Sequence, residues 1–266
     1  LNSLFENPSY VPLIGELMPS RWAFEGLAVH QFKGNEFKRE FFEVDQSRYN
    51  SIYEGDRVAT VQQNLNDLHF SYLGGEPMQQ FAPEFELIRN ELASLLRMDV
   101  VSSFGSLNGM NPGNFNEQVY QEASDSLKIM RRYFRFQKSN ADKQRDALSK
   151  HLISEWGGVE AFQAKKREYT NKRLEDILMN KGQFVVEYKN SLVRKATPIY
   201  QVPDSLIGRA QFFAPVKRLG TFTLDTFWFN LAIIWVSTLV FYMTLVYDLL
   251  RKFARWNRIR KLRENT

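Results

Sequence analysis

The longest apolar run of the chain lies near its end, where 22 residues from Thr226 to Tyr247 carry no charged side chain. A helix of that length covers about 33 Å, close to the thickness of the hydrocarbon core of a bilayer. Its eleven Phe, Leu, Ile and Val residues favour insertion by about 3–6 kcal/mol, and Asn230 opposes part of that gain. The run predicts a transmembrane helix within residues 226–250. A buried helix of a soluble core is the alternative.

Upstream, apolar residues recur at steps of three and four, a spacing typical of helices that bury one face. Four such stretches lie at residues 58–68, 85–95, 119–152 and 159–180. The sequence also predicts a helix over 183–195, loops over 74–83 and 103–116, and an extended, proline-containing return path over 196–225. We therefore predict a mainly α fold, in which a helical bundle or long helical hairpin precedes one C-terminal transmembrane helix. The apolar stripes are interpreted as core positions.

A shorter helix is expected near the N-terminus, over residues 21–32, with Ser20 as its N-cap. Arg21 and Glu25 lie one turn apart and can form an ion pair, and Trp22 belongs to an apolar face. These three residues are the candidate site of this helix. The pattern fits a helix at the membrane interface or an ordinary surface helix.

Charged residues are distributed unevenly along the chain. Residues 251–266 contain seven basic residues and one acidic residue, whereas the net charge of the whole chain is only +5. The positive-inside rule places this basic tail in the cytoplasm and everything before Thr226 outside. We expect the tail to contact anionic lipid headgroups, and no general nucleic-acid-binding surface is indicated.

Four regions follow from these patterns: a membrane-proximal segment with its helix (1–32), an exterior helical domain (33–225), the transmembrane helix (226–250) and the basic cytoplasmic tail (251–266). Aromatic and basic residues at or near the membrane boundaries are the candidate membrane anchors. These candidates are Trp228, Trp235, Tyr247, Arg251, Lys252 and Arg255.

The exterior placement requires that the preceding residues cross the membrane. The sequence begins with Leu1 and has no signal-peptide pattern. We therefore expect an upstream membrane segment that drives translocation, which makes this chain the C-terminal piece of a longer polytopic protein. A reversed topology is the alternative.

Catalytic chemistry has little support in the sequence. With no cysteine, the chain forms no disulfide and offers no thiol nucleophile. His30, His69 and His151 are interpreted as structural histidines. Carboxylates such as Glu84, Glu86 and Glu91 are expected on solvated helix faces. The glycine-rich loop at 103–116 lacks the Gly-Lys-Ser/Thr of a phosphate-binding loop, so we assign no catalytic, cofactor-binding or metal-binding residue.

Two stretches at opposite ends of the chain resemble one family. LMPSRWAFEGLAVHQF (17–32) is similar to the segment after the fifth transmembrane helix of G-type, white/pigment-type ATP-binding cassette (ABC) transporters. GRAQFFAPVKRLGTFTLDTFWFNLAIIWVSTLVFYMTLVYDLLRKF (208–253) resembles the re-entry segment and last transmembrane helix of bacterial members with a large exterior insertion. FKGNEFKREFFEVDQ (32–46) is similar to the start of that insertion. Together they cover about a third of the chain.

The resemblance implies an ABC-2-type transmembrane domain in the bacterial cytoplasmic membrane, with residues 1–225 in the periplasm. It implies ATP and Mg²⁺ in an upstream nucleotide-binding domain, since this chain lacks GxxxxGK[ST] and is not expected to be an enzyme by itself. The expected partners are the lipid bilayer, the protein's own upstream segments and a second copy in a homodimer. Arg21 and Glu25 match polar positions of the family's connecting helix, where we interpret them as a structural brace.

Besides a part of an ABC transporter, the sequence leaves two other functions open. The chain could be a single-span, membrane-anchored helical scaffold that binds an envelope partner. It could also be a tail-anchored cytosolic protein of reversed orientation, against which the basic tail argues.

Overall fold

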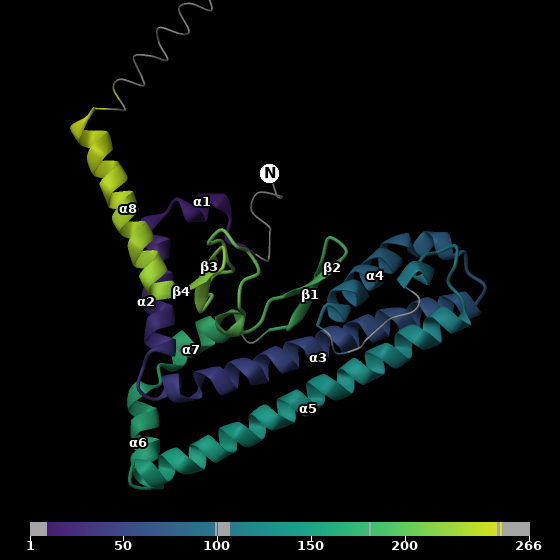
Figure 1. Cartoon of the computed structure of the whole chain (residues 1–266), viewed down its shortest axis with the longest axis horizontal. Helices are drawn as coiled ribbons and strands as arrows, with labels where there is room; N and C mark the ends of the chain where they lie inside the picture. The colour runs from purple at the N-terminus through teal and green to yellow at the C-terminus, as the bar shows by residue number, and fades with distance from the viewer. Residues whose placement is uncertain (1–9, 99, 101–106, 181, 249–250, 252–266) are drawn as a thin grey trace, which may run out of the picture.

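The computed structural model describes residues 10–98, 100, 107–180, 182–248 and 251. Its helices and strands follow one another as shown in Figure 1. The helices are α1 (Leu13–Glu16), α2 (Pro19–Lys33), α3 (Lys38–Leu73), η2 (Met78–Phe81), α4 (Ala82–Leu96), η3 (Leu107–Gly109), α5 (Glu117–Glu155), α6 (Val159–Tyr169), α7 (Lys172–Met179), η4 (Pro198–Tyr200) and α8 (Thr226–Val246). The strands are β1 (Val185–Tyr188), β2 (Ser191–Arg194), β3 (Val216–Leu219) and β4 (Phe222–Asp225). The mainly α fold is confirmed.

Two long antiparallel helices, α3 with 36 residues and α5 with 39, form the body of the molecule (Figure 1). At 1.5 Å per residue they extend for about 55 Å. The apolar stripes of α3, α4 and α5 meet in the largest core, as the helical spacing predicts. That core includes Val58, Val61, Leu65, Leu68, Phe85, Ile88, Leu92, Leu95, Val119, Ala123, Leu127, Met130 and Phe134.

A second, aromatic core joins the other end of this hairpin. Phe37 and Phe41 at the start of α3 pack with Leu152 of α5 and Phe162 of α6. The α5 helix ends at Glu155 with Trp156 as its C-cap, and Gly157 and Gly158, which both adopt positive φ, follow. Because such a backbone favours glycine, the two residues end the helix where the sequence predicts.

Residues 183–195 form an antiparallel hairpin, and the helix predicted there is wrong. Strands β1 and β2 pair in the register Val185 with Arg194, and their two-residue turn, Lys189 and Asn190, has positive φ at both positions. A turn of this kind matches the right-handed twist of two strands. The β-branched valines of both strands also favour extended backbone.

Smaller differences concern helix ends. The predicted helix over 159–180 is divided into α6 and α7, because the side chain of Asn171 accepts a hydrogen bond from the backbone of Leu174 and starts a new helix. Ile177 is 51% exposed, so it is not a core residue of α7. At α2 the N-cap is Met18, with Pro19 in the first turn, and Ser20 does not cap the helix.

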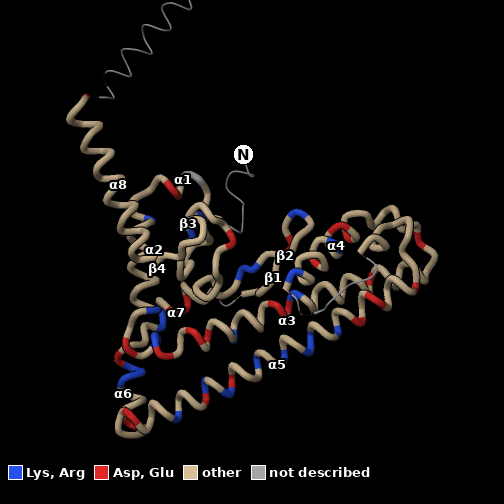
Figure 2. The backbone as a smooth tube through the Cα atoms, in the orientation of Figure 1, with Lys and Arg blue, Asp and Glu red and all other residues tan. Residues whose placement is uncertain are grey.

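The return path over 196–225 is largely extended, as predicted, and it closes with the β3–β4 hairpin in the register Val216 with Asp225. Strand β4 leads directly into α8. Among the described residues, α8 is the one helix long and apolar enough to span a membrane, judged by length and composition. Figure 2 shows α8 as a tube without charged residues along its length, in contrast to the charges spread over α3 and α5.

Candidate functional site

The junction of α2 and α8 brings together residues from both ends of the chain. Trp22 packs on Phe229 with ring centroids 6.0 Å apart, and His30 packs on Phe227 at 4.6 Å. The two helices therefore run antiparallel. Gly26 permits their close approach, since a Cβ at this position would lie 3.4 Å from the Cβ of Asn230.

Glu25 lies at the centre of this junction and is fully buried, with 0% exposure. Its Oε1 accepts a hydrogen bond from the Nζ of Lys217 at 2.8 Å and from the backbone N–H of Phe213 at 3.2 Å. Its Oε2 accepts one from the Nδ2 of Asn230 at 3.0 Å and lies 3.3 Å from an Arg21 nitrogen. The predicted pair of Arg21 and Glu25 is confirmed, within a larger network that joins α2, β3 and α8.

A second set of contacts surrounds Arg21. Its Nη1 donates to Glu16 of α1 at 3.0 Å, and its guanidinium lies 3.8 Å from the ring centroid of Trp22. The indole nitrogen of Trp22 donates to the backbone oxygen of Glu16 at 2.8 Å. The Nδ2 of Asn230 also donates to the backbone oxygen of Trp22 at 3.0 Å. These bonds fix α1 to the start of α2, and α2 to the start of α8.

The network contains two acidic and two basic side chains, so its formal charges balance. Burial lowers the pKa of Lys217, an effect that Glu25 opposes. Burial also raises the pKa of Glu16, which Arg21 opposes. Buried charges are tolerated only when they are paired and hydrogen-bonded, and removal of one partner therefore strongly destabilises the folded state. The arrangement is suited to holding three elements in a fixed relation.

The first turn of α8 has further attachments. Asp225 accepts a hydrogen bond from the backbone N–H of Phe227 at 3.0 Å, which caps the helix. It also forms an ion pair with Lys33 at 2.6 Å. The hydroxyl of Thr226 donates to the backbone oxygen of Ala214 at 2.5 Å. α8 is thus tied at its first turn to both α2 and the return path.

The predicted membrane anchors are exposed where they are described. Trp228, Trp235 and Tyr247 have exposed fractions of 65%, 69% and 52%. Trp228 and Tyr247 lie near the two ends of α8, whereas Trp235 lies at its middle, where an anchor at the membrane surface is not expected. Arg251 is exposed and 3.7 Å from Asp248. Lys252 and Arg255 lie outside the described residues.

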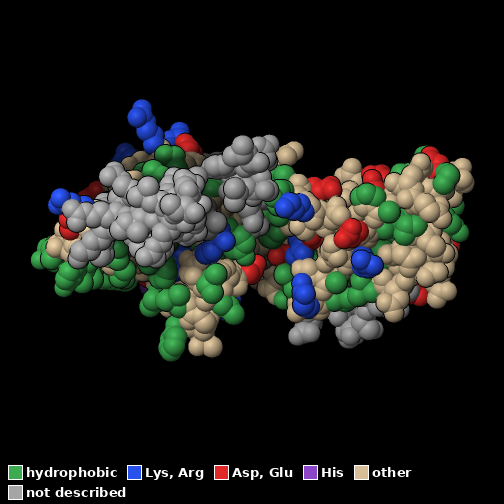
Figure 3. Space-filling model, turned by 90° about the horizontal axis from the view of Figure 1, so that it is seen from above, with side chains coloured by type: hydrophobic (Ala, Val, Ile, Leu, Met, Phe, Trp, Pro, Cys, Tyr) green, Lys and Arg blue, Asp and Glu red, His purple; other side chains and the backbone are tan. Residues whose placement is uncertain are grey.

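Exposed apolar side chains gather at the end of the molecule formed by α8, as the green surface at the left of Figure 3 shows. Charged side chains are spread over the remainder of that face. This distribution agrees with an apolar helix that projects from a polar body.

A second buried ion pair lines a cleft of about 720 Å³ between α3, α4, β2 and the return path. Arg57 of α3 donates to Glu91 of α4 and lies 3.3 Å from Glu54. Glu91 also accepts a hydrogen bond from the backbone N–H of Leu192 at 2.7 Å.

Glu91 is only 2% exposed, so the prediction that it lies on a solvated helix face is wrong. Glu84 and Glu86 are exposed, as predicted. Glu91 is buried because β2 packs over its face of α4.

Two other groups of this cleft are perturbed by burial. Burial raises the pKa of Tyr53 to about 12 and lowers that of Arg194 to about 10. Arg194 donates to Asn50 at 2.6 Å and to Thr197 at 2.6 Å, both neutral partners. Together these bonds hold the turn that follows β2 against α3.

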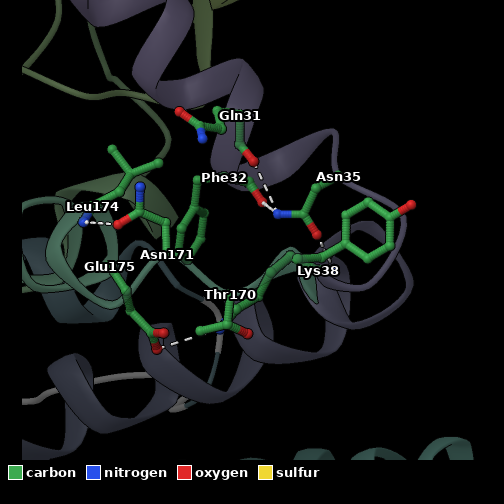
Figure 4. Close-up of a pocket in the computed structure, with 9 residues that line it drawn as sticks. Gln31, Phe32, Asn35, Lys38, Thr170, Asn171, Leu174 and Glu175 are labelled. Atoms are coloured by element: carbon green, nitrogen blue, oxygen red, sulfur yellow. Dashed lines mark hydrogen bonds and ion pairs between the residues drawn. The ribbon is translucent and has the colours of Figure 1, made fainter. Parts of the chain in front are cut away.

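A smaller hollow of about 10 Å³ lies where α2, α3 and the α6–α7 connection meet (Figure 4). Asn35 donates to the backbone oxygens of Gln31 and Phe32 at the end of α2, and Lys38 forms an ion pair with Glu175 at 3.3 Å. A volume of this size accommodates about one water molecule.

The histidines have structural surroundings. His69 stacks on Tyr120 at 3.6 Å and lies 2.7 Å from Glu117, and His151 lies 3.6 Å from Glu155 on the surface of α5. Within the described residues, no group of three or more His, Cys, Asp and Glu side chains could hold a metal ion.

Comparison with family models, with curated proteins and with solved structures gave no match to this chain. The site is therefore interpreted from its own geometry. Sequence reasoning identified Arg21, Trp22 and Glu25. It missed Lys217, which has no signal in an extended segment, and the role of Asn230, whose signal was an amide inside an apolar run.

Proposed function

We propose that this chain is the exterior helical domain and last transmembrane helix of an ATP-driven ABC-2-type transporter of the bacterial cytoplasmic membrane, acting as an exporter. The observation that carries the proposal is the buried network around Glu25. It joins the segments of residues 17–32 and 208–253, the two stretches with the family resemblance, through Lys217 and Asn230.

Such a junction would couple motion of α8 to the exterior domain. α8 is bonded to α2 at its first turn, and only residues 34–37 separate α2 from the long helix α3. A change in the tilt of α8 would therefore move the α3–α5 hairpin with it. In the proposed transporter, ATP-driven closure of upstream cytoplasmic domains tilts the membrane helices, and the exterior domain caps or gates the exit path.

In this proposal, residues 1–225 face the periplasm and the basic tail faces the cytoplasm, according to the positive-inside rule. The nucleotide-binding domain with its ATP and Mg²⁺ belongs to the upstream part of the polypeptide. The full protein acts as a homodimer, because a translocation path in this family forms between two membrane halves.

The test is ATP hydrolysis by the complete reading frame in membrane vesicles. We expect hydrolysis that is lost when the lysine of an upstream phosphate-binding loop is replaced. Glu25→Ala should reduce this hydrolysis, while Glu43→Ala on the exposed face of α3 serves as the matched control. A reading frame without a nucleotide-binding domain would overturn the proposal.

A membrane-anchored scaffold is the second candidate, and one observation favours it. Ile129, Tyr133 and Phe136 are exposed on α5 at a spacing of four and three residues, which places them on one helix face. An exposed apolar stripe of this kind often contacts a partner. The scaffold predicts no associated ATPase, so the same hydrolysis experiment separates the two functions.

A further inference from the structure

The polar residues of α8 gather on one side of the helix. Of its five Ser, Thr and Asn residues, Asn230, Ser237 and Thr244 are each seven positions apart, and Thr226 lies one turn before Asn230. Seven residues differ from two full turns by only about 20°. These four residues therefore form one face, which we call the polar face, and only Thr238 lies outside it.

The opposite side carries large aromatic residues. Trp228, Trp235 and Tyr242 are also seven positions apart, and all three are exposed. Since each residue advances by about 100° around a helix, Trp228 lies roughly 200° from Thr226. α8 thus has an aromatic face turned away from its polar face.

The beginning of the polar face is already an interface. Thr226 and Asn230 are buried against α2 and the return path, and Asn230 is 1% exposed. Its Oδ1 has no hydrogen-bond partner among the described residues. Beyond Asn230, no residue of α8 is buried within the described chain, so Ser237 and Thr244 continue the face without a partner helix.

The hydroxyl groups of this face make it suitable for close packing. Ser237 donates to the backbone oxygen of Ile233 at 2.8 Å, and Thr244 donates to that of Val240 at 2.7 Å. Both groups are satisfied inside their own helix and present small side chains outward. Small side chains let two membrane helices approach closely, and helix association in lipid depends on such contact.

We propose that the polar face of α8 from Ile233 to Thr244 binds a second, non-identical transmembrane helix that presents Gly, Ala, Ser or Thr. The inference rests on the proposed membrane span. The chemistry of this partner follows from α2, which already contacts the same face with Gly26. A second copy of α8 is disfavoured as this partner, because α2 covers the first turn of the face and would hold two copies apart there.

The test uses spin labels in the complete protein in membrane vesicles. Because this chain contains no cysteine, single cysteines at positions 234–244 provide defined label sites once any cysteines elsewhere in the polypeptide are replaced. Collision with oxygen, which concentrates in lipid, should vary with the helical period. We expect it to be at least about twofold lower at 237 and 244 than at 235 and 242, because a helix covers the polar face.

A pair of variants tests the contact itself. With the label at 244, Ser237→Leu should raise oxygen collision to the value at 242, because the larger side chain separates the helices. Trp235→Leu, on the aromatic face, should leave it unchanged. The opposite response of these two variants would overturn the assignment of the face.

The remaining outcomes are distinct. Uniformly high oxygen collision would mean that lipid covers the polar face, which overturns the inference but not the membrane span. Collision with a water-soluble nickel chelate at every position would overturn the span as well. Dipolar broadening between labels at 237 would identify a second copy of α8 as the occupant and contradict a non-identical helix.

Discussion

At the scale of single residues, the contacts of Glu25 decide how the exterior domain is joined to α8. Its two carboxylate oxygens accept three hydrogen bonds, from Lys217, Asn230 and the backbone of Phe213, and form an ion pair with Arg21, with no exposure to solvent. The site is therefore sensitive to the loss of one charge and tolerant of the loss of both, because an unpaired buried charge is the costly state.

Replacement of Glu25 by Ala should destabilise the protein by about 3–5 kcal/mol, because Lys217 stays buried without its partner. The measurement is denaturant unfolding of the detergent-solubilised protein, followed by tryptophan fluorescence. Glu43→Ala, at an exposed position of α3, should change stability by less than about 0.5 kcal/mol. The double variant Glu25→Met with Lys217→Met should recover most of the loss. Equal instability of the single and double variants would contradict the buried-pair interpretation.

Tyr53 gives a second residue-scale prediction, in alkaline solution. Its folded pKa of about 12 lies above the value of 10.0 for an exposed tyrosine. The unfolded chain therefore ionises Tyr53 first, and the stabilisation that is complete below pH 10 is lost as the pH rises to 12. Two pKa units correspond to about 3 kcal/mol. The Tyr53→Phe variant should lose about that much less stability than the wild type between pH 10 and 12. Parallel curves for the two proteins would exclude this effect.

At the scale of elements, helix ends and turns depend on single side chains that satisfy the backbone. The α5 helix begins at Glu117, directly after its N-cap Asn116, whose side chain accepts a hydrogen bond from the N–H of Val119 at 3.0 Å. This helix supplies one side of the largest core. Its first turn therefore connects local capping with the packing of the whole hairpin.

Asn116→Ala should destabilise the protein by about 1 kcal/mol, because loss of the cap leaves the backbone N–H of Val119 without its partner. Asn114 is the matched control, since it is exposed two residues earlier and its side chain does not cap the helix. The shift of the denaturation midpoint reports the difference. A change at Asn114 as large as that at Asn116 would show that the effect does not arise from capping.

At the scale of the whole molecule, the direction in which α8 crosses the membrane assigns each part to a compartment. α8 projects from one end of the body, and the long hairpin extends from the α2–α8 junction (Figure 1). The proposed function requires this hairpin on the periplasmic side. The reversed, tail-anchored topology requires it in the cytoplasm.

A cysteine introduced at exposed Ser139 of α5 should react with a membrane-impermeant maleimide in intact spheroplasts. A cysteine replacing Asn257 in the basic tail should react only after the membrane is permeabilised, because the positive-inside rule keeps the tail in the cytoplasm. The reverse pattern of labelling would establish the tail-anchored topology.

The sequence by itself determined the elements whose signals are local. The step of three and four residues predicted α3, α4 and α5 with their buried faces, the uncharged run predicted α8, and the spacing of Arg21 and Glu25 predicted their ion pair. The 185–194 hairpin was missed because Lys189, the first left-handed residue of its turn, has no preference for that conformation, and Asn190, which does, is not followed by the glycine of the usual Asn-Gly signal.

Only the tertiary structure decided which distant residues meet. Lys217 and Asn230 reach Glu25 across about two hundred positions of the chain, and the backbone N–H of Leu192 reaches Glu91 across about one hundred. The reason is physical. Helical periodicity is set by neighbours within one turn, whereas the burial of a charge depends on which elements the fold brings together, and no local pattern encodes that.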